Sequence, residues 1–134
     1  MLVTGNQPGL IQSFKDEMNK VFEMTNLGVM KCFLGMEVMQ SCSRIFICQQ
    51  KYVMDMLKKF KMQDCKPVST PMTTSEKLSK DDGSEKIDEG LYRSLIGSLL
   101  YLTTSRPDIL FAVSVLSRFM HSPSEKHFQQ LKEY

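Results

Sequence analysis

The adjacent carboxylates Asp81 and Asp82 are the residues whose type and spacing come nearest to metal chemistry. Paired metal ions that promote phosphoryl transfer need closely placed carboxylates to hold them, and Mg²⁺ takes hard oxygen ligands in near-octahedral geometry. The pair lies between Lys80 and Gly83 in a polar segment with no apolar strand beside it, so nothing nearby would fix both side chains. We therefore interpret the pair as part of a solvated loop.

The remaining candidates for chemistry have no catalytic pattern. The four cysteines include no C-x-x-C pair, and the two histidines are not at zinc-ligand spacing. We interpret the cysteines as reduced thiols, which favours an intracellular setting, cytoplasmic or nuclear. His127 has no evident carboxylate partner along the chain, and we expect it to pack or to lie on a helix surface. We assign no catalytic and no metal-binding residue.

The composition is that of an ordinary globular protein, with 42% hydrophobic and 24% charged residues in 134. Because no apolar run reaches the length needed to span a bilayer, we expect no membrane partner. The net charge is only +2, but its distribution is uneven. Residues 51–66 contain five lysines against two aspartates, and residues 76–89 contain three lysines against six acids. The pattern predicts a basic helix followed by an acidic loop.

Two periodicities predict the elements of the first half of the chain. Apolar residues recur at helical spacing over residues 8–23, which predicts an amphipathic helix. Apolar and other residues alternate from Met30 to Val38, which predicts one strand with an apolar face, and residues 44–48 read as the return strand of an antiparallel hairpin. A second amphipathic helix is expected over 51–61.

The second half is expected to be helical. Residues 63–88 are rich in Ser, Thr and Pro and read as a linker, and three helices are expected from residue 89 onward. Gly97 lies inside the first of them, where a missing side chain would permit close approach of another element. Ser105 is expected to cap the second helix, with Asp108 completing a capping box, and the pattern repeats at 122–125. The whole reads as an α+β chain.

Several short sequence motifs occur in the order found in the reverse transcriptase of copia-type long-terminal-repeat retrotransposons. The chain resembles that family over nearly its whole length. The matching motifs are Phe33-Leu34-Gly35-Met36-Glu37-Val38, Gln50-Lys51-Tyr52, Leu57-Lys58-Lys59-Phe60-Lys61-Met62, Ser69-Thr70-Pro71-Met72, Tyr92-Arg93-Ser94-Leu95-Ile96-Gly97-Ser98-Leu99-Leu100-Tyr101-Leu102 and Arg106-Pro107-Asp108-Ile109. The resemblance implies a partial reverse-transcriptase palm with an antiparallel hairpin, followed by a helical thumb and connection segment. Residues 1–48 would be the end of the palm, 49–62 a basic thumb helix, 63–88 a flexible linker and 89–134 a truncated thumb and connection segment.

The same resemblance implies which chemistry is expected. In the family an Asp-Asp pair, with a third aspartate, holds two Mg²⁺ ions, and the opening Met1-Leu2-Val3-Thr4 resembles the strand that leaves this pair. We therefore expect no cofactor in this chain, and a reverse transcriptase fragment without polymerase activity of its own. Its expected partners are an RNA/DNA template–primer duplex and the rest of a Pol polyprotein. The alternative is a non-catalytic module, derived from a retroelement, that binds nucleic acid or protein.

The resemblance also implies the nucleic-acid-binding residues. They are Phe33, Leu34, Gly35 and Met36, as a grip on the primer strand, and Lys51, Lys58 and Lys59, as phosphate contacts of the thumb. Such phosphate contacts give binding that is independent of sequence and sensitive to salt. Two alternatives stay open from the residues alone: Leu34 and Met36 are core residues, and the lysines only solubilise an exposed helix face.

Overall fold

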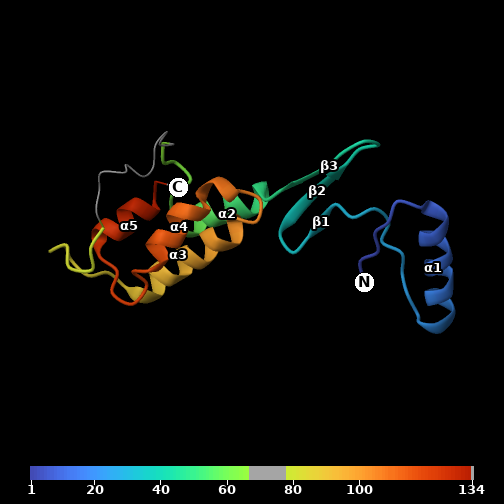
Figure 1. The fold of residues 1–134 in the computed structure, drawn as a ribbon, viewed down its shortest axis with the longest axis horizontal. Helices are drawn as coiled ribbons and strands as arrows, with labels where there is room; N and C mark the ends of the chain where they lie inside the picture. Colours follow the sequence, from blue (N-terminus) through green and yellow to red (C-terminus); the bar gives the residue numbers. More distant parts are fainter. Residues whose placement is uncertain (67–77, 134) are drawn as a thin grey trace. The chain divides into compact units, whose positions relative to one another are not determined.

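The computed structural model describes residues 1–66 and 78–133, which fall into two compact units, Met1–Met30 and Lys31–Tyr134 (Figure 1). The first unit contains helix α1 (Pro8–Val21), which confirms the helix predicted over 8–23. Pro8 suits the first turn because its missing N–H leaves no donor unpaired there. No residue of α1 is buried, and Leu10 of its apolar stripe is 66% exposed. Within its own unit, α1 is therefore a helix without a core beneath it.

The second unit begins with a three-stranded antiparallel sheet of β1 (Cys32–Phe33), β2 (Met36–Gln40) and β3 (Ile45–Cys48), in that order. The predicted hairpin is confirmed between β2 and β3. The prediction of one strand from Met30 to Val38 is wrong, because a turn at Leu34 and Gly35 divides it. Both residues have positive φ, 49° and 76°, and two such residues in a row make the tight turn whose twist matches that of a hairpin. The alternating pattern could not show this reversal.

The helical part of the unit consists of α2 (Gln50–Lys59), α3 (Glu89–Leu102), α4 (Leu110–Ser117) and α5 (Glu125–Leu131). A short 3₁₀ turn, η1 (Pro107–Ile109), precedes α4. These helices lie together in Figure 1 and enclose one apolar core. The fully or nearly fully buried core residues are Met56, Tyr92, Leu95, Ile96, Leu99, Leu102, Ile109, Val113, Leu116 and Leu131. The α+β class and the predicted helices are confirmed.

One polar group is placed inside this core with its hydrogen bond satisfied. Tyr92 is fully buried on α3, and its hydroxyl donates to the carbonyl oxygen of Leu116 on α4 at 2.9 Å. Burial raises the pKa of Tyr92, so the phenol stays protonated and keeps donating. The bond fixes the register of α3 against α4.

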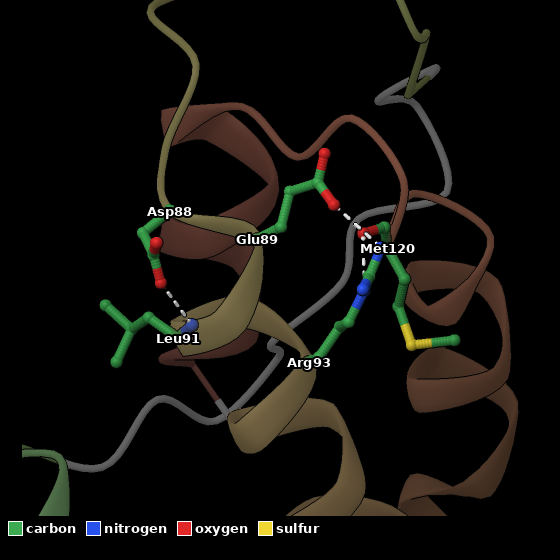
Figure 2. A network of polar contacts seen from close by, with 5 residues as sticks. All are labelled: Asp88, Glu89, Leu91, Arg93 and Met120. Atoms are coloured by element: carbon green, nitrogen blue, oxygen red, sulfur yellow. Dashed lines mark hydrogen bonds and ion pairs between the residues drawn. The ribbon is translucent and has the colours of Figure 1, made fainter.

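Polar contacts at the start of α3 tie it to the turn that follows α4 (Figure 2). The Asp88 carboxylate caps α3 by accepting from the Leu91 backbone N–H at 2.6 Å. Arg93 forms an ion pair with Glu89 at 2.7 Å, and its Nε donates to the Met120 carbonyl at 3.3 Å. The Arg93 side chain therefore connects the first turn of α3 with the backbone just beyond α4.

The structure places the two predicted caps differently from expectation. Ser105 does not cap the helix that follows it: its hydroxyl donates to the Gln49 side chain at 2.6 Å, and Asp108 pairs with Arg106 instead. At α5 the N-cap is Ser124, and His127 completes a capping box. A hydroxyl near a helix start has several acceptors within reach, and tertiary packing selected Gln49 for Ser105.

The described part of the predicted linker is attached to the helices. Residues 67–77, which include the Ser69-Thr70-Pro71-Met72 motif, lie outside the described residues. Beyond them, the chain at Lys86 forms an antiparallel bridge with Ser124. The Ile87 N–H donates to the Pro123 carbonyl at 3.1 Å, and the Glu125 N–H donates to Glu85 at 2.9 Å. Residues 85–87 thus line up beside the start of α5.

Candidate nucleic-acid interface

The turn between β1 and β2 presents the predicted grip residues to solvent. Leu34 is 71% exposed and Phe33 is 43% exposed, whereas Met36 is half-buried. The interpretation of Leu34 as a core residue is therefore wrong, and for Met36 partial burial agrees with it. Gly35 is needed for its backbone, since its φ of 76° is one that side chains disfavour.

Two of the three predicted lysines stand free on α2. Lys51 and Lys58 are both exposed and lie seven residues apart on one face of the helix, and neither forms an ion pair or a hydrogen bond with a side chain of residues 1–66 and 78–133. The opposite side of α2 is fixed by Met56, which is buried in the core. A helix anchored on one side and basic on the other can present charge to phosphates without rearrangement.

Lys59 differs from the other two lysines. Its ammonium donates to the Ser94 hydroxyl on α3 at 2.8 Å and lies 5.2 Å from the centroid of the Phe60 ring. Both contacts link α2 to neighbouring side chains. The structure thus brings Lys59 into the helix–helix contact and leaves Lys51 and Lys58 facing solvent.

Sequence reasoning did not assign a function to the residues that connect the turn with the helices. Tyr101, near the end of α3, donates from its hydroxyl to the Leu34 carbonyl oxygen. Its ring packs edge-on against Tyr52 of α2, with centroids 4.9 Å apart. Gln49, only 3% exposed, donates to the Tyr101 carbonyl at 3.4 Å. The available signal was the two tyrosines, Tyr52 and Tyr101, inside the matching motifs; Gln49 lies just before the motif that begins at Gln50.

The prediction that the acidic pair lies in a solvated loop is wrong for Asp82, because its carboxylate accepts hydrogen bonds from Ser84 and Ser124. Its carboxylate accepts from the Ser84 N–H at 2.9 Å, the Ser84 hydroxyl at 2.6 Å and the Ser124 hydroxyl at 2.7 Å. These hydrogen bonds, those from Ser84 first, hold the pKa of Asp82 far below its usual range. Asp81 is exposed beside it. Asp82 anchors its loop to the start of α5.

His127 has the packing role expected of it. It is fully buried, its ring stacks on Phe119 with centroids 4.0 Å apart, and its Nδ1 accepts from the Ser124 N–H at 3.1 Å. Burial lowers the pKa of His127, and the nearby Lys86 lowers it further, while Asp82 and the Ser79 backbone raise it. The neutral ring is the form that fits, because Nδ1 must stay unprotonated to accept.

The described residues do not fit a pair of Mg²⁺ ions. Within residues 1–66 and 78–133, no three His, Cys, Asp or Glu side chains are grouped so that they could hold a metal ion. Both oxygens of Asp82 are already occupied by hydroxyl and amide donors. In the same described part, no helix is long and apolar enough to cross a membrane.

Comparison with known proteins decides the family. Residues 1–74 match the family model described as "Reverse transcriptase (RNA-dependent DNA polymerase)". The chain belongs to the reverse transcriptase family. It is 40% identical to the retrovirus-related Pol polyprotein from transposon RE1 of Arabidopsis thaliana and 36% identical to that from transposon TNT 1-94 of Nicotiana tabacum, over 98% of its own length in each case. No solved structure matches the chain.

The reverse transcriptase relatives are much longer than this chain. The chain spans 9% of the RE1 polyprotein and 11% of the TNT 1-94 polyprotein. It also matches an uncharacterized mitochondrial protein of Arabidopsis thaliana at 36% identity, and there it spans 55% of the relative's length. The predicted resemblance to copia-type Pol polyproteins is confirmed along nearly the whole chain.

Proposed function

We propose that this chain is a duplex-binding part of a retrotransposon reverse transcriptase, which contacts a template–primer duplex through its phosphates and does not itself polymerise DNA. The observation that carries the proposal is the exposed pair Lys51 and Lys58, on a helix whose other side is anchored in the core through Met56. Each lysine in contact with a phosphate would release counterions, so binding would be independent of sequence and would weaken with salt.

The exposed turn at Leu34 and Gly35 supplies the second part of the proposed interface. Gly35 has no side chain, so it permits a nucleic-acid backbone to approach this turn closely. The Phe33 and Leu34 side chains beside it are exposed and could pack against a primer strand's sugars and bases. The rest of a Pol polyprotein would complete the polymerase around this part.

Anisotropy of a labelled template–primer duplex, titrated with the protein at several salt concentrations, tests the binding proposal. Neutralising both lysines, Lys51→Gln with Lys58→Gln, should reduce the slope of log affinity against log salt by about 2, since each phosphate contact contributes roughly 1. The matched control is Lys20→Gln with Lys126→Gln, which removes the same charge from exposed positions elsewhere. Equal effects of the two double variants would refute the assignment to α2.

Primer extension with Mg²⁺ tests the second half of the proposal. We expect no extension by the purified chain above a mock preparation, because the described acidic groups include no set that could seat two metal ions. Asp82→Asn serves as an internal check, since the proposal gives this carboxylate a loop-anchoring role. Extension that disappears in Asp82→Asn would contradict the proposal.

A further inference from the structure

We propose that Tyr101 is a positioning residue that fixes the turn at Leu34 and Gly35 against the helices, and so sets where the primer-contacting turn lies relative to the lysines of α2. The inference rests on the proposed function for what the turn contacts. The linkage itself rests on the packing of Tyr101 alone.

The hydroxyl of Tyr101 reaches the middle of the turn. It donates to the Leu34 carbonyl oxygen, and it lies 3.5 Å from the position that a Cβ on Gly35 would occupy. The Leu34 side chain cannot hold the turn, because it is 71% exposed. The phenol is therefore a tie between the backbone of the turn and the end of α3.

Tyr101 is itself held from two directions. Its ring packs edge-on against the Tyr52 ring at an interplanar angle of 72°, a contact that does not involve the Tyr52 hydroxyl. Its own carbonyl accepts from Gln49, whose side-chain oxygen accepts from Ser105 at 2.6 Å. A phenol with a fixed ring and a fixed backbone can transmit that order to the turn it touches.

The tie matters because little else orders this end of the sheet. β1 has only two residues, and short antiparallel strands have marginal stability of their own. No residue of β1 or β2 is buried. Lys51 directly precedes Tyr52, the ring partner of Tyr101, so the same contact connects the turn with the first turn of the basic helix.

Two single-atom deletions separate this role from general packing. Tyr101→Phe removes the hydroxyl that reaches Leu34 and leaves the ring on Tyr52. Tyr52→Phe is the matched control, because it removes the other hydroxyl of the same ring pair, which reaches Ser98 and not the turn. Each variant would be compared with the unsubstituted chain in two measurements. The first is amide hydrogen exchange over residues 33–37, and the second is the affinity for a duplex with a recessed primer end relative to that for a blunt duplex.

For Tyr101→Phe we expect exchange over residues 33–37 to quicken about fivefold, and the preference for the recessed primer end over the blunt duplex to fall by a similar factor, as for loss of one neutral hydrogen bond. The salt slope set by Lys51 and Lys58 should not change. Tyr52→Phe should leave exchange in the turn and the preference as they are.

The outcomes decide the linkage and the function separately. Unchanged exchange over residues 33–37 in Tyr101→Phe, or the same change in Tyr52→Phe, overturns the positioning role. Faster exchange with an unchanged primer-end preference also overturns it. If the unsubstituted chain binds no duplex, the proposed function fails and the primer-positioning role fails with it, whereas the exchange data still decide whether Tyr101 orders the turn.

Discussion

The three-stranded sheet and the helical cluster both contain many apolar side chains, but only the helices bury them. Leu99 and Leu116 are 1% and 0% exposed, whereas Phe46 and Ile47 on β3 are 58% and 51% exposed. The cross-strand pairs place apolar residues on both faces of the sheet: Val38 opposite Ile47 on one, and Met39 opposite Phe46 on the other. The helices therefore account for the stability of this unit, and the sheet leaves apolar side chains exposed on both of its faces.

This division has a physical basis in how each element can bury area. A helix buries one stripe against its neighbours, and α3 meets both α4 and α5. A three-stranded sheet needs a layer on at least one face, and the contact of β2 with α2 covers only part of it. Substitutions of one kind should therefore have different effects in the two regions.

The largest contrast should come from removing a large apolar side chain. Leu99→Ala leaves a cavity in the core and should lower the free energy of unfolding by about 2–5 kcal/mol. Ile47→Ala, on the half-exposed strand, should lower it by no more than about 1 kcal/mol. Urea unfolding followed by circular dichroism measures both, and equal losses would remove the distinction between the two regions.

A pH dependence should be confined to the helical region. Because burial lowers the pKa of His127 below its unfolded value near 6.5, the unfolded chain takes up the proton first on acidification. The free energy of unfolding should therefore fall as pH drops below about 6.5, by at most about 1.4 kcal/mol per pH unit for one proton. The Asp82 carboxylate, with its lowered pKa, stays ionised here and loses its contribution only at more acidic pH.

The variant His127→Gln sharpens this test, because glutamine at the third helical position also completes a capping box with a serine. It should retain the cap and lose the fall in the free energy of unfolding that His127 causes below about pH 6.5. Thermal unfolding at a series of pH values provides the measurement. A pH slope that survives in His127→Gln would assign the dependence to another group.

A glycine substitution in the sheet should have a smaller effect. Gly35→Ala places a Cβ on a residue with φ of 76°, which disfavours the turn by about 1–2 kcal/mol. Since the helices do not depend on the turn, the loss should appear as faster amide exchange in β1 and β2, with the helical amides unchanged. Slowed exchange in the turn would contradict the assigned backbone conformation.

The smallest effect, with the opposite sign, is expected for a glycine on α3. Gly97 was expected to permit close approach of another element, but a Cβ built there has no described atom within 4 Å. Gly97→Ala should therefore raise the free energy of unfolding by about 0.5–1 kcal/mol through helix propensity alone. A thermal midpoint that falls would reveal a contact at this face.

The predictability of the fold follows the same division. Periodic apolar residues were enough to predict α2, α3, α4 and α5, because these helices each bury a stripe in one core, and the same period predicted α1 although no residue of α1 is buried. The turn at Leu34 and Gly35 was missed because apolar and other residues alternate through it without a break. Only the positive φ values of these two residues mark the reversal of chain direction. The attachment of Asp82 was missed because its partner Ser124 lies 42 residues away, beyond any local pattern.

The candidate site was predictable in part. The basic face of α2 follows from charge and spacing, and Lys51 and Lys58 lie where that pattern puts them. The engagement of Lys59 by Ser94 depends on the angle between α2 and α3, which the sequence does not encode locally. Tyr101 has no pattern of its own, since a tyrosine near the end of an apolar helix stripe reads as a core residue.

The bridge between Lys86 and Ser124 affects whether the fragments separate after proteolytic cleavage of this chain. It joins the two ends of the segment that contains α3 and α4, and Arg93 adds a second link to Met120. Because the two ends of that segment are joined by hydrogen bonds, a single backbone cleavage between α3 and α4 would leave the two fragments bound to each other. A protease nick there should therefore be silent in a native sizing experiment and visible only after denaturation.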